Sequence, residues 1–372
     1  MKIRTLTTVA VATLSLGVVT ACGTAPPSSN NGGGTKAATA TSAQDLGGMS
    51  KLIAAAKKEG QLNVIALPPT WANYGTIIKT FQQKYGIKVN SAQPDAASQD
   101  EINAAKQLQG RQSAPDVFDL GQSVALANTS MYAPYKVQEW DTIPSGFKDA
   151  NGTWVNDYGG YMSIGYDSKK VPAISHVNDL LKPAYKGKVA LNGDPTQAGA
   201  AFSGVMMASL ANGGSADDIG PGVKFFGKLK QAGNFVPVDP TPATIESGQT
   251  PVVIDWDYTN AAETQQLPSW KVVVPSEAVV AGYYFQAINK DAPHPAAARL
   301  WEEFLYSDQG QNLWLAGGAR PVRADAMSKA GTIDKAKYDA LPKVTGTPVV
   351  PTNAQTEKAA TYLSKNWTKA VG

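Results

Sequence analysis

The sequence has very few of the side chains that most catalytic and metal sites require. Its 372 residues include one cysteine and two histidines, and His176 and His294 both lie in polar, proline-containing stretches typical of surface loops. One cysteine cannot form an internal disulfide. So few histidines leave no Cys/His cluster for zinc and almost no base for a nucleophilic triad. Gly-Lys-Ser/Thr phosphate loops and Gly-x-Ser-x-Gly elbows are also missing. We therefore expect a protein that is not an enzyme and has neither a resident metal nor a cofactor.

Long apolar runs are missing as well. The stretch from Val9 to Val19 follows Lys2 and Arg4 and is too short to span a bilayer. It leads into Val19-Thr20-Ala21-Cys22, the small-residue pattern that precedes a lipidated cysteine. We predict a lipoprotein signal over residues 1–22 with lipid on Cys22; the alternative is an ordinary secretory signal that contains a cysteine. Lipid on Cys22 would anchor the protein outside the cytoplasm, on the cell surface or in the periplasm, without spanning the membrane.

Neither sign of charge dominates. Without Lys2 and Arg4, 31 basic residues face 30 acidic ones. This balance argues against a nucleic-acid partner and against a membrane surface bound by charge. An acid-pair hydrolase is still compatible with the plentiful Asp and Glu, as is a surface interaction protein without a small ligand.

Composition also divides the chain. Residues 23–45 are rich in Gly, Ser, Thr, Pro and Asn, so we expect a flexible tether, with folded structure beginning near Leu46. The remainder, roughly 325 residues, exceeds what one core usually supports, which favours two domains.

Helix and strand patterns alternate along the folded part. Apolar spacing and glycine stops predict helices that end at Gly60 and Gly86, and a polar helix is expected near residues 98–111. Strands are expected at 62–67, 87–90, 115–120, 161–166, 188–192, 252–255, 271–274 and 283–288. Asp194 as N-cap and Pro195 as first helical residue predict a helix after the fifth strand. Later helices are expected near residues 300–305, 308–316 and 355–369. Such βαβ alternation is typical of parallel sheets covered by helices.

Several short motifs, in order, resemble one protein family. They are residues 52–60, Trp71-Ala72-Asn73, Pro115-Asp116-Val117-Phe118-Asp119, Gly193-Asp194-Pro195, Val253-Ile254-Asp255-Trp256-Asp257, residues 307–311 and residues 319–323. Together with the leader, they resemble the solute-binding proteins of bacterial ABC importers, most closely the group for spermidine/putrescine, ferric iron, thiamine or aminoethylphosphonate.

The resemblance implies an α/β, two-lobed periplasmic-binding-protein fold (type II, Venus-flytrap) with two crossing hinge strands, near residues 161–166 and 282–288. Lobe 1 would comprise residues 46–160 plus 286–345, and lobe 2 residues 165–280, followed by a turn-rich segment and helix over 346–372. It also implies a monomer that binds a small solute, with the permease subunits and ATPase of an importer as partners.

Candidate ligand contacts lie in loops that follow strands, because ligands of open α/β sheets sit beyond the carboxyl ends of strands. Aromatic, amide and acidic groups gather in four such loops. They are Trp71, Asn73 and Tyr74; Asp119 and Gln122; Asp194, Thr196 and Gln197; and Asp255, Trp256, Asp257 and Tyr258. In each loop the alternative is a helix cap or a core contact. If the last strand persists, Asp255 and Asp257 face one side and Trp256 the other.

Tyr283, Tyr284 and Arg320 complete the candidate set, the tyrosines at the return crossing and Arg320 after a Gly-Gly turn. Among these candidates, acidic and aromatic groups outnumber arginines. Acidic groups and aromatic rings each attract cations. We therefore expect a small organic cation such as putrescine or spermidine. Arg320 and the helix N-terminus leave aminoethylphosphonate open, and ferric iron and thiamine are further alternatives.

Overall fold

The computed structural model describes residues 32–341 and 344–372. Its first strands, β1 (Gln61–Ile65) and β2 (Lys88–Ala92), pair in parallel, as the alternating pattern predicts. The remaining strands form one mixed sheet in the order β3-β9-β5-β7-β6, with three further strands on its edges. Their bounds are β3 (Val117–Leu120), β4 (Tyr132–Ala133), β5 (Val155–Asp167), β6 (Val189–Leu191), β7 (Val252–Trp256), β8 (Trp270–Val273), β9 (Ala281–Asn289) and β10 (Arg320–Pro321).

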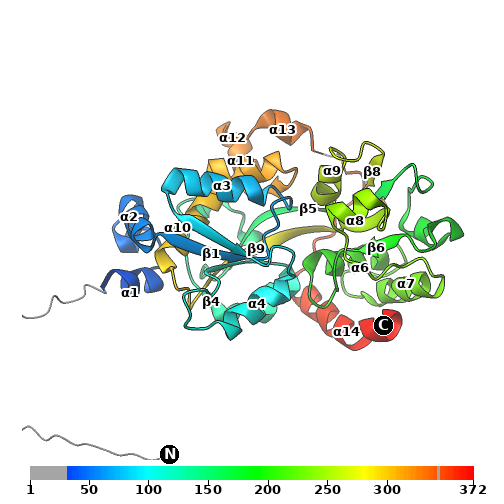
Figure 1. Ribbon diagram of the computed structural model, residues 1–372, viewed down its shortest axis with the longest axis horizontal. Helices are drawn as coiled ribbons and strands as arrows, with labels where there is room; N and C mark the ends of the chain where they lie inside the picture. Colours follow the sequence, from blue (N-terminus) through cyan, green and yellow to red (C-terminus); the bar gives the residue numbers. More distant parts are fainter. Residues whose placement is uncertain (1–31, 342–343) are drawn as a thin grey trace, which may run out of the picture. The chain divides into compact units, whose positions relative to one another are not determined.

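Strand β5 belongs to both halves of the molecule. Its first part pairs with β9, from Val155 opposite Gln286 to Tyr161 opposite Ala281. Its second part pairs with β7, from Met162 opposite Trp256 to Tyr166 opposite Val252. Both predicted crossings therefore fall on these central strands, and Figure 1 shows β5 and β9 running between the two groups of helices.

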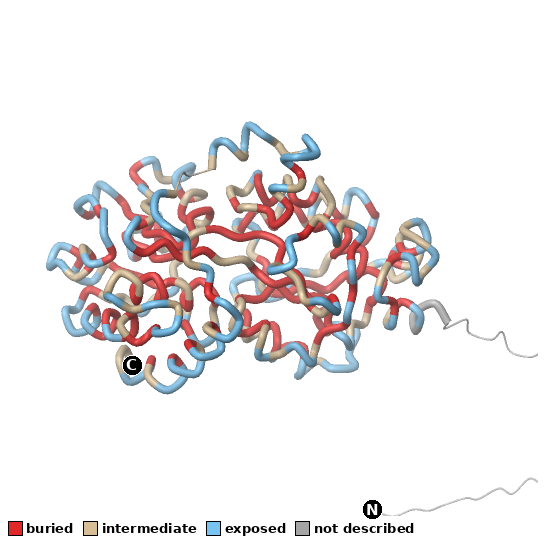
Figure 2. The backbone as a smooth tube through the Cα atoms, turned by 180° about the vertical axis from the view of Figure 1, so that it is seen from behind, coloured by how far each residue is buried: buried red, intermediate tan, exposed pale blue. Residues whose placement is uncertain are grey.

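Helices cover the sheets on either side of these strands. The helices on the side of β1 and β3, which we call lobe 1, are α1 (Gly32–Thr39), α2 (Met49–Glu59), α3 (Tyr74–Tyr85), α4 (Ser98–Gln107), α5 (Gln122–Ala127), α10 (Pro295–Tyr306), α11 (Asp308–Ala316), α12 (Ala324–Ala330) and α13 (Lys335–Asp339). The helices on the side of β6 and β7, which we call lobe 2, are α6 (Gly199–Leu210), α7 (Gly220–Gln231), α8 (Pro242–Ser247) and α9 (Asp257–Glu263). The last helix is α14 (Asn353–Val371). Buried residues concentrate along the strands and the inner helix faces, and exposed residues lie on the outer turns (Figure 2).

The start of the folded region differs from the prediction. We expected a flexible tether up to residue 45, but α1 begins at Gly32, and Ala37, Ala40 and Ala43 are buried. Arg299 of α10 is itself buried and donates to the carbonyl oxygens of Ala40 (2.8 Å) and Ala38 (2.9 Å). Small alanines pack closely on α10, which a composition rule based on large apolar groups does not detect. Residues 1–31, with the predicted signal, Cys22 and the first part of the tether, lie outside the described residues.

The helix after β6 also differs. Asp194 was expected to cap it, with Pro195 in the first turn, but α6 starts at Gly199 with Ala198 as N-cap. Asp194 instead accepts hydrogen bonds from the backbone N–H and hydroxyl of Thr196, at 2.7 and 2.6 Å. This local turn satisfies the carboxylate and delays the helix by one turn.

Candidate functional site

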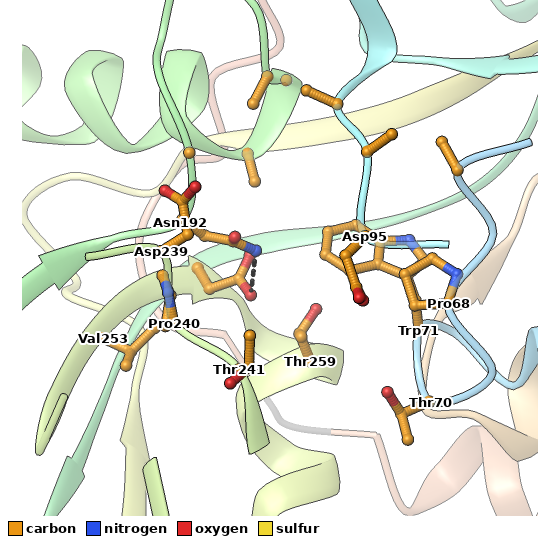
Figure 3. Close-up of a pocket in the computed structure, with 18 of the residues that line it drawn as sticks. Pro68, Thr70, Trp71, Asp95, Asn192, Asp239, Pro240, Thr241, Val253 and Thr259 are labelled. Atoms are coloured by element: carbon orange, nitrogen blue, oxygen red, sulfur yellow. Dashed lines mark hydrogen bonds between the residues drawn. The ribbon is translucent and has the colours of Figure 1, made fainter. Parts of the chain in front are cut away.

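A cavity of about 320 Å³ lies between loops of lobe 1 and elements of lobe 2. Figure 3 shows Pro68, Trp71 and Asp95 on one side of it and Asn192, Asp239 and Pro240 on the other. The loops after strands, the start of α6 and residues of α4, α8 and α9 supply the lining. Lobe 1 contributes Ala66, Pro68, Thr70, Trp71, Asp95, Ala96, Ala97, Ser98, Glu101, Asp119 and Tyr284. Lobe 2 contributes Asn192, Gly193, Ala198, Gly199, Ala200, Asp239, Pro240, Thr241, Pro242, Ile245, Val253, Asp255, Thr259, Asn260, Ala262 and Glu263.

Two lobe 1 loops that border the cavity have unusual backbone conformations. Ala66, Ala72 and Asn73 in the β1–α3 loop adopt φ of 57°, 44° and 70°, and Gln93 before α4 adopts 42°. Within the described chain, these are all the non-glycine residues with positive φ. Strained backbone of this kind clusters at ligand sites, because surrounding contacts hold it in place.

Trp71 is fixed by aromatic neighbours and one hydrogen bond. Its indole N–H donates to the hydroxyl of Tyr158 at 2.7 Å, and its ring lies edge-on to Tyr258 and Tyr284 at 5.8 and 5.7 Å. The side chain is only half-buried, so part of the ring faces the cavity. This arrangement presents a rigid aromatic surface to a ligand.

Asp119 at the end of β3 forms the acidic wall of lobe 1. The hydroxyl of Tyr158 donates to its Oδ2 at 2.9 Å, and the nearby Tyr74 hydroxyl also favours the ionised carboxylate. Its Oδ1 is buried and makes no well-formed hydrogen bond to the described residues. Burial raises the pKa of Asp119 to about 7. Glu101 lies behind it and accepts from the Asp119 backbone N–H at 3.0 Å, and burial raises the pKa of Glu101 well above its usual value. Asp119 and Glu101 can therefore lose protons when a cation binds beside them.

Asp255 is the corresponding group of lobe 2. It lies on β7, accepts from Asn192 Nδ2 at 2.9 Å and from the backbone N–H of Trp256 at 2.7 Å, and is 2% exposed. Burial raises its pKa to about 7. Glu263, at the end of α9, also lines the cavity and is buried, and burial raises its pKa.

The charges of the cavity have one sign. Asp95, Glu101, Asp119, Asp239, Asp255 and Glu263 line it, and no Lys, Arg or His is among its described lining residues. Asp95 and Asp239 are exposed, so they lie at the opening, and the other four are buried. Where these acids are ionised, their charge favours a cation over an anion beside the cavity wall.

The structure brings four predicted residues together in this cavity: Trp71, Asp119, Asp255 and Tyr284. Tyr284 stacks on Tyr158 with centroids 5.3 Å apart. The sequence pattern placed Asp255 and Asp257 on one face, but β7 ends at Trp256 and α9 starts at Asp257. The chain turns there, so only the first of the two acids faces the cavity.

Asp257 and Arg320 lie outside the cavity and pair with each other. The guanidinium Nη1 lies 2.7 Å from Asp257 Oδ2, and the Arg320 group lies over the Tyr161 ring. Asp257 Oδ1 also accepts from the Tyr161 backbone N–H at 3.0 Å. This pair, in which Asp257 is buried and Arg320 half-buried, joins α9 to β5 and β10, so Arg320 supports the fold here.

The other predicted contacts lie away from the cavity too. Tyr74, Trp256 and Tyr258 are buried in the aromatic core, where Tyr74 packs edge-on against Trp314 at 4.8 Å. Asn73 donates to the Leu313 carbonyl at 2.9 Å, and Gln122 donates to the Pro351 carbonyl at 3.2 Å. The remaining predicted residues are Tyr283, which packs on Phe147, and Asp194, Thr196 and Gln197 in the exposed turn before α6.

Sequence reasoning missed most of the cavity acids. Glu101 lies in a helix with so many polar residues that a buried carboxylate leaves no periodic signal. Glu263 ends α9, and Asp239 precedes Pro240 in an irregular segment. The Asp239-Pro240-Thr241-Pro242 stretch does contain a helix-start pattern, with Thr241 as N-cap of α8. Among the missed acids, only Asp239 therefore lay beside a sequence pattern that could have pointed to it.

Metal ligation gains no support from side-chain clusters. Among the residues that the structure describes, no three His, Cys, Asp or Glu side chains gather as ligands for a metal ion. His294 is buried, so it is not the surface-loop residue that its sequence suggested. It lies 2.9 Å from Asp116 Oδ2, which also accepts from the backbone N–H of Asn63 in β1 at 2.6 Å, and this contact fixes the start of α10 against β1. None of the helices in the described chain is long and apolar enough to cross a membrane.

A family model described as bacterial extracellular solute-binding protein matches residues 116–346, more than half of the chain. The chain belongs to this family. Family members of this kind bind solutes outside the cytoplasm for ABC importers, so this solute-binding protein is an importer component and not an enzyme.

Solved structures of periplasmic binding proteins share the fold of this solute-binding protein. AfuA from Actinobacillus pleuropneumoniae, with fructose-6-phosphate bound, is 19% identical, with 84% of this chain and 98% of that chain covered and a TM-score of 0.64. The ferric binding protein from Campylobacter jejuni is 18% identical, with 83% and 99% covered and a TM-score of 0.61. A protein assigned to spermidine/putrescine transport in Listeria monocytogenes is 13% identical, with 84% and 98% covered and a TM-score of 0.63. These similarities show the two-lobed fold, and the three proteins bind or are assigned different solutes.

Proposed function

We propose that this solute-binding protein captures a small organic cation with primary ammonium groups, of the putrescine or spermidine kind. The cavity would close around it by a hinge motion of β5 and β9 and deliver it to the permease. In the same proposal, lipid on Cys22 holds the protein at the membrane, and the lobes have the bounds expected from the sequence, except that lobe 1 also includes α1. The observation that carries the proposal is the charge of the cavity: six acidic residues line it and no described lining residue is basic.

Ammonium groups match what the walls offer. Asp119 Oδ1 is a buried acceptor without a well-formed hydrogen bond to the described residues, and a buried oxygen of this kind costs free energy until a donor reaches it. Trp71 and Tyr284 add aromatic faces, each attracting a cation by about 0.5–2 kcal/mol. Apolar side chains such as Pro68, Pro240 and Ile245 line the space between the acids and suit a methylene chain.

Anionic solutes fit this cavity poorly. A phosphonate or sugar phosphate needs guanidinium, ammonium or free backbone N–H donors. The start of α6 at Gly199 borders the cavity and has no side-chain cap, but no guanidinium or ammonium group is among the described lining residues, and Arg320 is paired with Asp257 outside the cavity. Bringing an anion beside buried carboxylates would add repulsion in a low-dielectric site. The acidic lining therefore favours the amine over aminoethylphosphonate.

A thermal-shift screen tests the proposal. Putrescine, spermidine, thiamine, aminoethylphosphonate and ferric citrate are added separately to the purified chain. Ligand at a hundredfold excess over its dissociation constant adds about 2.7 kcal/mol of stability, which raises the unfolding midpoint by several degrees. We expect this shift with an amine. A shift with the phosphonate or with iron alone would overturn the proposal.

Site variants then locate the amine. Asp119→Asn and Asp255→Asn keep the shape of each side chain and remove its charge, so each should weaken amine binding about tenfold or more. Asp194→Asn is the matched control, because this exposed carboxylate precedes α6 outside the cavity. The amine affinity of this control should equal that of the unaltered protein. An equal loss of amine affinity in all three variants would contradict the assignment of the amine to this cavity.

A further inference from the structure

Glu263 is a buried carboxylate that faces the cavity without a donor. It is the last residue of α9, lines the cavity and is 7% exposed. Its Oε2 is shielded from solvent and has no hydrogen-bond partner among the described residues. A carboxylate with one oxygen shielded in this way loses part of its hydration without compensation. Oε2 of Glu263 is therefore an acceptor that a ligand or a proton can satisfy.

The groups around Glu263 are acidic or already engaged. Glu246 on α8 and Asp255 on β7 are its charged neighbours, and like charge from Glu246 adds to burial in raising the Glu263 pKa. Asn260, one turn earlier on α9, donates its amide to Ser163 Oγ at 2.9 Å. No described neighbour supplies a positive charge to Glu263, so a cation in the cavity would be its first ion-pair partner.

The two lobes divide the acceptors between them. Lobe 1 presents Asp119, whose Oδ1 makes no well-formed hydrogen bond to the described residues, and lobe 2 presents Glu263, whose Oε2 makes none. Asp255 differs, because Asn192 and a backbone N–H already donate to it. A solute with one positive charge can satisfy one lobe only, whereas a solute with a charge at each end satisfies both.

Resting on the proposed capture of an organic cation, we propose that Glu263 receives a second positive charge and makes the site selective for diamines over monoamines. One ammonium lies against Asp119 in lobe 1 and the other against Glu263 and Asp255 in lobe 2, with the methylene chain between them. The dication draws the lobes together through both ends, and Glu263 is the residue that sets this specificity.

Calorimetric titration with putrescine and butylamine tests the inference, since the two have the same chain length and differ by one amino group. The unaltered protein should bind putrescine at least about tenfold more tightly, the value of one charge-assisted hydrogen bond. Glu263→Gln should abolish that difference and leave butylamine affinity unchanged. The matched control is Glu246→Gln, an exposed carboxylate on α8 outside the cavity, which should keep the preference.

The outcomes separate this inference from the proposed function. Amine binding with equal affinity for putrescine and butylamine in the unaltered protein overturns the diamine assignment alone. The diamine assignment is also overturned if Glu263→Gln loses affinity for both putrescine and butylamine, or if it loses affinity for neither. Failure of the unaltered protein to bind any amine overturns the proposed function together with it.

A second variant tests the same contact if the Glu263→Gln protein does not fold. Glu263→Asp keeps the charge but withdraws it by one methylene, so in a series of α,ω-diamines the optimum should lengthen by about one carbon. An unchanged optimum would contradict contact between Glu263 and the second ammonium. The unliganded Glu263→Gln protein should unfold at the same temperature as the unaltered protein or higher, because a lone buried carboxylate is removed.

Discussion

Asp119 and Asp255 face the same cavity from opposite lobes, and burial raises the pKa of each to about 7. Neutral groups support both of them: Tyr158 donates to Asp119 and Asn192 to Asp255. An empty cavity near neutral pH therefore holds a mixture of protonated and ionised acids. A bound ammonium favours the ionised forms, so binding of a cation releases protons.

Affinity and stability should depend on pH in opposite directions. Amine affinity should rise from pH 6 to pH 8, because more of Asp119 and Asp255 is ionised before binding. The folded pKa of each acid lies above its ordinary value of 3.8. Between about pH 4 and pH 7 the folded state therefore binds more protons than the unfolded state, and the unliganded protein loses stability as pH rises through this window.

Thermal unfolding with and without putrescine between pH 5 and pH 8 measures both trends. The double variant Asp119→Asn/Asp255→Asn should reduce both trends, because neither amide titrates, and should leave the part that the raised pKa values of Glu101 and Glu263 contribute. An affinity that stays constant over this range, in a protein that does bind the amine, would contradict the role of these two acids.

Single residues also show what the sequence could and could not predict about the site. Trp71 and Asp119 follow strands, and the rule about strand ends found both. The same rule chose Asp257, and Arg320 was chosen because it follows a Gly-Gly turn. The two form an ion pair with each other, since position in the sequence does not reveal whether a charge already has a partner. Glu101 and Glu263 come from helices and reach the cavity only through tertiary packing.

Among the elements, α5 and α6 approach each other most closely at two glycines. A Cβ added to Gly121 would lie 2.6 Å from the Gly199 Cα and 2.9 Å from its backbone nitrogen. Gly121 precedes α5 of lobe 1, and Gly199 begins α6 of lobe 2 and lines the cavity. This contact sets how near the two helix starts can come.

Gly121→Ala should hold the two helices apart. The added methyl group meets backbone atoms, which cannot turn aside as a side chain can, so the lobes must separate slightly. We expect weaker solute binding by about tenfold, measured by titration, with little change in secondary structure by circular dichroism. Gly146→Ala is the control, because no atom lies within 4 Å of its added Cβ. Equal affinity in both variants would show that the contact does not limit closure.

Element bounds were predictable where apolar spacing was regular and stops were explicit. The helices that end before Gly60 and Gly86, and α11 over Asp308–Ala316, match the prediction closely. The α1 helix was missed because its contacts are alanine methyl groups and carbonyls held by Arg299, which lies some 260 positions away in the chain. Contacts over such separations are not encoded in local spacing.

Across the whole molecule, the C-terminal segment joins both lobes. Val349 pairs with Val280 beside β9, Gln122 of α5 donates to the Pro351 carbonyl, and α14 packs against both α5 and α7. At its end, Trp367 is buried and contacts Phe226 of α7 with ring centroids 5.3 Å apart. The same segment thus contacts α5 in lobe 1, the central strand β9 and α7 in lobe 2.

Trp367→Ala should therefore lower the stability of the fold without altering the cavity. Loss of a buried tryptophan costs about 3–5 kcal/mol, which a urea titration of the unliganded protein measures. Tyr362→Ala, which removes a 37% exposed ring from the same helix, should cost much less. Because no residue of α14 lines the cavity, amine affinity under folding conditions should stay within about threefold of the unaltered value. A tenfold change in affinity with intact folding would instead show that α14 controls the spacing of the lobes, and would assign it a part in closure.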